Sequence, residues 1–240
     1  MANTEQILTI DTIFTSEEAA VAQTGLSGWS ALVMAGYGFT GDAAFAGQQF
    51  QLEYGDAERP IITVLHDGTS IIASLVLSRR SEFGDTRAYG VHGIVVRPDH
   101  MGRGLGSKLY ERAVQDNGID IVVGSTKTPA AVAARARALA RCDMRTFFGL
   151  REITGGEPIN TTTLRGFLDT YLAHSSGEVD PDTSLIYKDT NVLLPDIPHV
   201  ERLPEHIQRA FEPIIAAQKE VGDTKTATLP LLSIKSHLLI

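Results

Sequence analysis

Residues 94–107 read IVVRPDHMGRGLGS, an apolar run followed by a proline-containing turn and three alternating glycines. The apolar run predicts a strand that ends at Pro98, because proline cannot donate a hydrogen bond to a strand ladder. From Gly104 onward the apolar residues recur with helical spacing, which predicts a helix that stops at Asn117-Gly118. The glycines therefore join the end of a strand to the start of a helix.

This junction is suited to binding an anion. The first backbone N–H groups of a helix have no partner inside the helix, and the helix macrodipole adds partial positive charge there. Glycines let the backbone approach phosphate oxygens closely. A turn that only connects the two elements is the alternative, but glycine costs up to about 1 kcal/mol relative to alanine inside a helix. The pattern favours a phosphate site.

The stretch resembles the GNAT superfamily of acyl-CoA-dependent N-acyltransferases, whose signature is Gln or Arg, two residues, Gly, one residue, then Gly or Ala. Gly104 and Gly106 occupy the two glycine positions. The segments at 128–133 and 149–153 also resemble that family. The resemblance covers residues 7–153, with a last strand expected near 184–188. It implies an α/β fold with a mixed, mostly antiparallel central sheet flanked by helices.

The resemblance also implies acetyl-CoA as the cosubstrate, entering where the sheet splays beside the strand 119–124. The histidines do not show ligand spacing for a metal, so no metal is expected. The residues expected to contact the cofactor are Val95, Val96, Met101, Gly102, Arg103, Gly104, Leu105, Gly106 and Ser107. Met101 stands where the family has Gln or Arg. A side-chain contact to the phosphates is thereby lost, while the backbone donors remain.

The activity implied is transfer of an acetyl group to a primary amine by direct attack. Deprotonating an ammonium of pKa near 10.4 at pH 7 costs about 4 to 5 kcal/mol, so a base is useful. His92 lies on the strand before the loop, where family members often place a glutamate, and an imidazole of pKa about 6.5 suits the task. Glu82 and Asp85 are alternative bases. A structural role is the alternative for His92, with its ring nitrogens hydrogen-bonded within the sheet. A non-catalytic acyl-CoA-binding or regulatory module is the alternative function.

The tyrosine with which many family members protonate the leaving thiolate has no counterpart. Counting from Pro129 places Arg135 at that position, whereas counting back from Gly149 places Arg145 there. A thiol has a pKa near 8.5 and leaves readily, so an arginine could offset the developing charge. A solvated helix residue is the alternative for Arg135.

A Rossmann dinucleotide site is the competing interpretation of the glycines. It is disfavoured, because its fingerprint needs Gly-x-Gly-x-x-Gly directly after the strand.

The rest of the chain predicts alternating strands and helices. Asp67-Gly68 predicts a hairpin, Thr15 with Glu18 predicts a capping box, and Asp42 predicts a helix start. The expected strands cover 7–14, 61–66, 70–78, 87–96, 119–124, 146–153 and 184–188. The expected helices start after Thr15, Asp42 and Gly104 and at Pro129, where Thr128 is the expected cap, and two more cover 164–174 and 205–220.

Composition narrows the function classes. The 240 residues are 43% hydrophobic and 21% charged, which is typical of a soluble globular protein. A net charge of −8 argues against nucleic acid and anionic membranes as partners and suits an amine acceptor, whether a small molecule or a protein. Cys142 is the only cysteine, and no secretion signal or membrane-spanning run is evident, so we expect a cytoplasmic protein.

We expect two parts along the chain. Residues 1–190 would form the GNAT-like acetyltransferase domain. Residues 191–240 would form a C-terminal extension, because the run 229–234 is too apolar to remain in water. That extension would pack on the domain or against a partner subunit in a homodimer.

Overall fold

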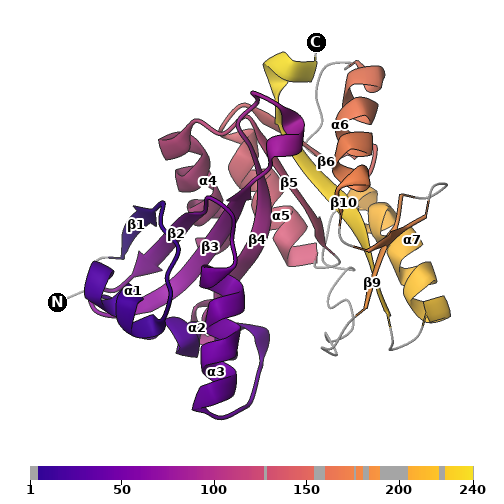
Figure 1. Ribbon diagram of the computed structural model, residues 1–240. Helices are drawn as coiled ribbons and strands as arrows, with labels where there is room; N and C mark the ends of the chain where they lie inside the picture. Colours follow the sequence, from indigo (N-terminus) through magenta and orange to yellow (C-terminus); the bar gives the residue numbers. More distant parts are fainter. Residues whose placement is uncertain are drawn as a thin grey trace. The chain divides into compact units, whose positions relative to one another are not determined.

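The computed structural model describes residues 5–126, 129–153, 160–175, 177–180, 184–189, 205–221 and 225–239. Figure 1 shows the chain in the colours of the sequence. The chain divides into two compact units. The first unit comprises Met1–Arg80 and Tyr89–Ile119, and the second comprises Ser81–Ala88 and Asp120–Ile240. Each unit is described by itself.

The first unit is built on an antiparallel sheet. Its strands follow one another in the order β1 (Gln6–Ile10), β2 (Ile61–His66), β3 (Ile71–Arg79) and β4 (Ala88–Val96). The hairpin between β2 and β3 turns at Asp67-Gly68 as predicted. Asp67 Oδ1 accepts hydrogen bonds from the N–H groups of Ser70 at 2.9 Å and Thr69 at 3.1 Å. These bonds lower the pKa of the Asp67 carboxyl.

The helices of the first unit are α1 (Glu17–Thr24), α2 (Trp29–Tyr37), α3 (Ala43–Phe50), which continues as the π-helix Gln51–Gly55, and α4 (Leu105–Asn117). Asp42 caps α3 as predicted, accepting from the N–H of Phe45 at 2.9 Å. The predicted Thr15 cap of α1 is wrong by one residue, because the side chain of Ser16 accepts from the N–H of Ala19. The first strand also ends sooner, at Ile10.

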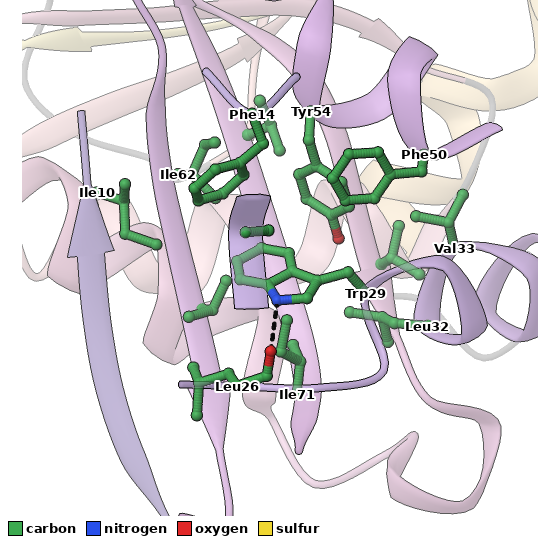
Figure 2. Packing of buried hydrophobic residues seen from close by; sticks show 14 of the residues in the cluster. Ile10, Phe14, Leu26, Trp29, Leu32, Val33, Phe50, Tyr54, Ile62 and Ile71 are labelled. Atoms are coloured by element: carbon green, nitrogen blue, oxygen red, sulfur yellow. Dashed lines mark hydrogen bonds between the residues drawn. The ribbon is translucent and has the colours of Figure 1, made fainter. Parts of the chain in front are cut away.

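An aromatic cluster fastens α2 and the π-helix to one face of this sheet (Figure 2). Trp29 is fully buried, and its ring meets the edges of Phe14 at 5.0 Å and Tyr54 at 5.1 Å between centroids. Its indole Nε1 donates to the carbonyl of Leu26 at 2.9 Å, so the buried polar atom is satisfied. α4 packs on β2 and β3. The packing of Tyr54 therefore holds the π-helix Gln51–Gly55 against the sheet.

The second unit contains β5 (Ile121–Thr126), β6 (Met144–Phe148), β7 (Arg151–Glu152), β8 (Glu178–Val179), β9 (Ile186–Asp189) and β10 (Lys225–Lys235). The single strand expected over 146–153 is wrong. Gly149 adopts φ 60° and turns the chain back, so β6 and β7 form a short hairpin. Only glycine adopts this left-handed conformation readily.

β10 is an inner strand of this unit. Its residues 229–234 pair with β5, and its residues 231–235 pair with β6, both antiparallel. Its first residues, 225–228, pair instead with β9. Pro230 lies where the partner changes from β9 to β6, and its carbonyl accepts from the N–H of Gly149 at 2.8 Å. Residues 231–234 of the apolar run thus pair on both sides within the sheet, while the boundary expected at residue 190 remains a prediction.

Helices cover both faces of the strands of this unit (Figure 1). α5 (Pro129–Ala140) and α7 (Glu205–Val221) pack with Leu229 and Leu231 of β10. α6 (Thr161–Ala173) packs with Leu232 and Ile234, which alternate to the other face. The Thr128 cap expected for α5 lies outside the described residues. Among the described helices, none is both long and apolar enough to cross a bilayer.

The inner position of β10 predicts a large cost for shortening its side chains. Leu232→Ala removes a fully buried side chain and should lower the free energy of unfolding by about 2 to 5 kcal/mol, measured by urea denaturation. Leu150→Ala is the matched control, because Leu150 is 47% exposed and its truncation should cost less than about 0.5 kcal/mol. Equal losses in the two variants would contradict the inner position of β10.

Candidate functional site

The glycine loop follows β4 through one short turn. β4 ends at Val96, and the 3-10 helix Pro98–His100 reverses the chain before the glycines begin. Gly102 and Gly104 have φ values of 78° and 74°, and Gly104 is the N-cap of α4. A residue with a side chain pays roughly 1 to 2 kcal/mol for this left-handed conformation. The two glycines therefore fix the path by which the strand enters the helix.

The start of α4 is open and uncapped. Gly104 makes no side-chain capping bond, and its carbonyl receives the N–H of Lys108 at 3.2 Å. The first N–H groups of an α-helix have no carbonyl partner within the helix. A Cβ atom placed at Gly102 or Gly104 would meet nothing within 4 Å, so the loop leaves space beside its backbone. A phosphate group fits this arrangement, since it needs both the donors and the room.

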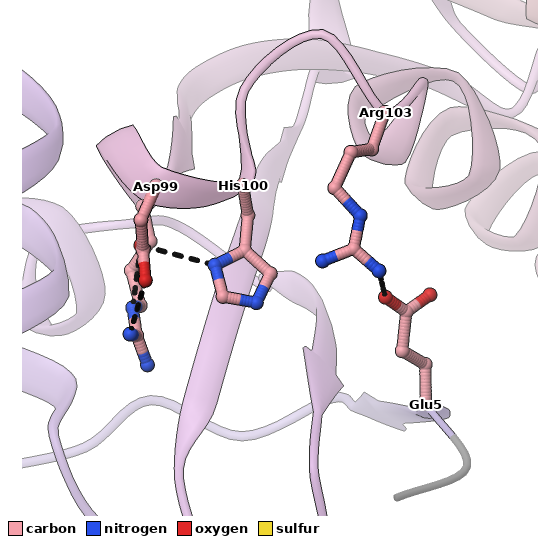
Figure 3. A network of polar contacts seen from close by, with 5 residues as sticks. Glu5, Asp99, His100 and Arg103 are labelled. Carbon is pink, nitrogen blue, oxygen red and sulfur yellow. Dashed lines mark hydrogen bonds and ion pairs between the residues drawn. The ribbon is translucent and has the colours of Figure 1, made fainter. Parts of the chain in front are cut away.

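Charged side chains surround the loop (Figure 3). Arg97 Nη2 lies 2.7 Å from Asp99 Oδ2, and His100 Nδ1 lies 3.0 Å from Asp99 Oδ1. The Arg97 guanidinium, followed by His100, lowers the pKa of Asp99 to about 2. Glu5 pairs with Arg103 and, at 3.2 Å, with Lys108. Exposed pairs of this kind contribute about 0 to 1 kcal/mol, so an incoming phosphate can compete for both cations.

His92 is the extra residue of a β-bulge in β4. Val76 of β3 pairs with Gly93 and Leu77 pairs with Val91, which leaves His92 without a partner in the ladder. Its imidazole is exposed, and Nε2 lies 2.6 Å from the carbonyl oxygen of Leu52. A carbonyl only accepts, so Nε2 carries the hydrogen and Nδ1 of the neutral ring carries the lone pair. Bulges re-aim side chains in this way next to functional sites.

Glu53 lies beside this bulge, and sequence reasoning missed it. Its side chain is only 6% exposed, and its Oε2 accepts a hydrogen bond from the Tyr37 hydroxyl at 3.2 Å. Burial raises the pKa of the Glu53 carboxyl, while the charge of His92 and the bond from Tyr37 act in the opposite direction. A Cβ atom at Gly93 would overlap the Glu53 carboxylate, so the glycine is what admits it.

The comparisons with known proteins identify this part of the chain. Residues 29–140 match the model of the acetyltransferase (GNAT) family, and they include α2, β4, His92 and the glycine loop. This part of the chain belongs to the acetyltransferase (GNAT) family. The predicted fold class is confirmed, with antiparallel pairing and helices in each unit and with strands beyond the matched region.

Solved structures of acetyltransferases are similar to this chain at low sequence identity and low TM-score. An IAA acetyltransferase from Bacillus cereus is 18% identical, covering 60% of this chain and 79% of its own, with a TM-score of 0.35. The ribosomal-protein-S18-alanine N-acetyltransferase from Escherichia coli is 14% identical over 59% and 77%, with a TM-score of 0.39. Diaminobutyrate acetyltransferase from Paenibacillus lautus is 10% identical over 97% and 96%, with a TM-score of 0.40. None of the curated proteins matches this chain.

The nine residues expected to contact acetyl-CoA differ in how far their side chains are exposed. Val95 is buried, and a Cβ atom at Gly36 of α2 would overlap it. Leu105 and Ser107 are also buried, in α4. Met101 is 56% exposed. The expected contacts of all nine residues with acetyl-CoA remain predictions.

The other expected site residues of the GNAT domain belong to the second unit. Arg135 is not a solvated helix residue, because it is 1% exposed and donates from Nε to Ser233 Oγ at 3.1 Å and from Nη2 to the Val122 carbonyl. Arg145 pairs with Glu152 through Nε at 2.8 Å and through Nη2. Both guanidinium groups thus bind neighbouring strands. Asp85 is exposed on a turn, and Glu82 lies in the 3-10 helix Ser81–Phe83.

The positive φ of Gly104 gives a test of the phosphate site. Gly104→Ala keeps the space but strains the left-handed conformation, so it should turn the helix N–H groups and weaken CoA binding about tenfold or more. Gly25→Ala is the matched control, since Gly25 has φ 71° and nothing within 4 Å but caps the far end of α1. Calorimetric titration with CoA measures both. Equal affinity in the two variants would overturn the assignment of the loop.

Proposed function

We propose that this GNAT protein is an N-acetyltransferase, which transfers an acetyl group from acetyl-CoA to a primary amine by direct attack. One observation carries the proposal. The strand that leads into the open N-terminus of α4 also presents an imidazole, His92, with one ring nitrogen fixed as a donor and the other left as an acceptor. An anion site and a base thus lie along one strand.

The donor half of the site would be the glycine loop. The N–H groups at the start of α4 would bind the pyrophosphate of acetyl-CoA, and Arg103 and Lys108 would exchange Glu5 for phosphate oxygens. Bound there, acetyl-CoA supplies a thioester carbon that is open to nucleophilic attack. Both cations are about half exposed, so neither needs to leave the protein interior.

The distance along β4 suits a bound thioester. His92 lies four positions before Val96 at the end of the strand, which corresponds to about 13 Å at roughly 3.3 Å per residue. The pantetheine arm of CoA separates its thioester from its pyrophosphate by a comparable span when extended. A cofactor anchored at the loop and lying along β4 would thus bring its thioester near His92.

The proton and the bonds can be followed through the reaction. The acceptor arrives as an ammonium and gives one proton to Nδ1 of His92, which leaves a lone pair on the amine nitrogen. That lone pair forms the C–N bond at the thioester carbon, and the C–S bond breaks. CoA leaves as a thiolate and is then protonated by the imidazolium, and the second proton of the amine passes to water. A thiolate is a good leaving group, so the missing tyrosine is not essential.

Exchange of His92 tests this mechanism. His92→Gln should lower kcat/KM for a primary amine by about 10² to 10⁴ and remove the loss of rate at acid pH that protonation of the imidazole causes. His66→Gln is the control, because His66 ends β2 and accepts only the N–H of Gly68 through Nδ1. Free-thiol release from acetyl-CoA, followed across pH, is the measurement.

Two results would change the account. Normal turnover in His92→Gln would show that His92 has a structural role. CoA binding without turnover of any amine in the unaltered protein would instead favour the non-catalytic acyl-CoA-binding module.

A further inference from the structure

The Glu53 carboxylate is a buried polar group of the first unit that the proposed reaction has not used. Oε2 has the Tyr37 hydroxyl as a donor, but Oε1 is buried and has no hydrogen-bond partner among the described residues. A buried acceptor left without a donor is costly, and native structures rarely keep one without a reason. Oε1 therefore calls for a donor that the chain itself does not supply.

The surroundings of Glu53 indicate which donor fits. The described groups that influence the carboxyl are Tyr37 and His92, and neither is an arginine or a lysine. A hydroxyl cannot carry a balancing charge, and an imidazole carries one only when protonated. A ligand that brings both an N–H and a positive charge would complete the site. An ammonium group does so.

The residues that precede Glu53 and Gly93 in the chain are exposed. Leu52, which precedes Glu53, is 48% exposed, and His92, which precedes Gly93, is exposed as well. The bond from His92 Nε2 to the Leu52 carbonyl, 2.6 Å long, joins these two exposed residues. The exposed imidazole of His92 and the buried carboxylate of Glu53 are thus neighbours at the bulge. The π-helix Gln51–Gly55 supplies the wide turn from which Glu53 reaches Gly93, and such turns are frequent at functional sites.

We propose that Glu53 is the binding group for the acceptor, accepting a hydrogen bond from its ammonium through Oε1 beside His92, and that the acceptors are amines without a carboxylate on the adjacent carbon. This rests on the proposed function. An amino acid would bring its own carboxylate within a few ångströms of Glu53, and two like charges repel strongly in a buried site. The site thus selects alkylamines, including lysine-like side-chain amines, over α-amino acids.

The test compares two acceptors that differ only in this carboxylate, 1-propylamine and 2-aminobutyrate. The unaltered protein should prefer 1-propylamine by about tenfold or more in kcat/KM. Glu53→Gln should lower kcat/KM for 1-propylamine by about 100-fold and narrow that preference, because the acceptor loses its positioning charge. Glu58→Gln, the same change at an exposed residue of the same unit, should alter neither value.

Two further readouts separate binding from folding and from turnover. Millimolar 1-propylamine without any CoA should raise the Tm of the unaltered protein and not that of Glu53→Gln. The variant itself should melt no lower than the unaltered protein, since it removes a buried charge, and CoA should still raise its Tm. If Glu53 had a structural role, the Glu53→Gln substitution would instead lower the Tm.

The outcomes are distinct. Retained turnover and retained preference in Glu53→Gln, or a propylamine effect on Tm that is equal in both proteins, would overturn the assignment of Glu53 and leave a bound water as the donor to Oε1. A propylamine effect that depends on Glu53, in a protein that never releases CoA, would support the amine site and reject the proposed function.

Discussion

The site depends on the pairing of β3 with β4, because that register fixes every group which the proposed reaction uses. The ladder runs from Arg79 opposite Tyr89 to Ala73 opposite Val96, and it is interrupted only at the bulge. The regular part delivers the end of β4 to the glycine loop and α4. The bulge adds one residue, His92, and turns its imidazole out of the ladder toward Leu52. A register slip of one residue would remove both arrangements together.

Two glycines let helical segments approach β4 closely. Gly36 of α2 admits Val95, and Gly93 of β4 admits the carboxylate of Glu53. The packing of Glu53 against Gly93 lowers the stability of the fold, because burial raises the pKa of Glu53 and disfavours its ionised form. A carboxyl with a raised pKa in the folded state stabilises the fold least at high pH. The loss of stability begins as pH rises past the pKa that the Glu53 carboxyl has in the unfolded chain. It is complete above the pKa that the carboxyl has in the folded protein.

The sequence predicted the features whose signals are local. The Asp67-Gly68 hairpin, the Asp42 cap and the strand-loop-helix around Gly104 each depend on a few neighbouring residues, and the structure has all three. The inner place of β10 was not predicted, because Pro230 argues against a central strand and the pairing with β5 spans about a hundred residues.

The functional importance of Glu53 was also out of reach of the sequence. Nothing in the run QLEYG separates this glutamate from any other at the end of a helix, and its position emerges only when Gly93 packs against it. Arg135 illustrates the converse. Its helical neighbours suggested a solvated basic face, whereas tertiary packing buries it against Ser233 and the Val122 carbonyl. Side-chain burial of this kind depends on contacts far apart in the chain.

The central claim is that a primary amine attacks acetyl-CoA directly in a site along β4. The most direct measurement is mass spectrometry of both the small molecules and the protein after the full chain is mixed with acetyl-CoA and 1-propylamine. The account predicts N-acetylpropylamine and free CoA in equal amounts, with no acetyl group left on the protein at any time. An acetylated protein that forms before the amide, or hydrolysis of acetyl-CoA with no amide, would contradict it.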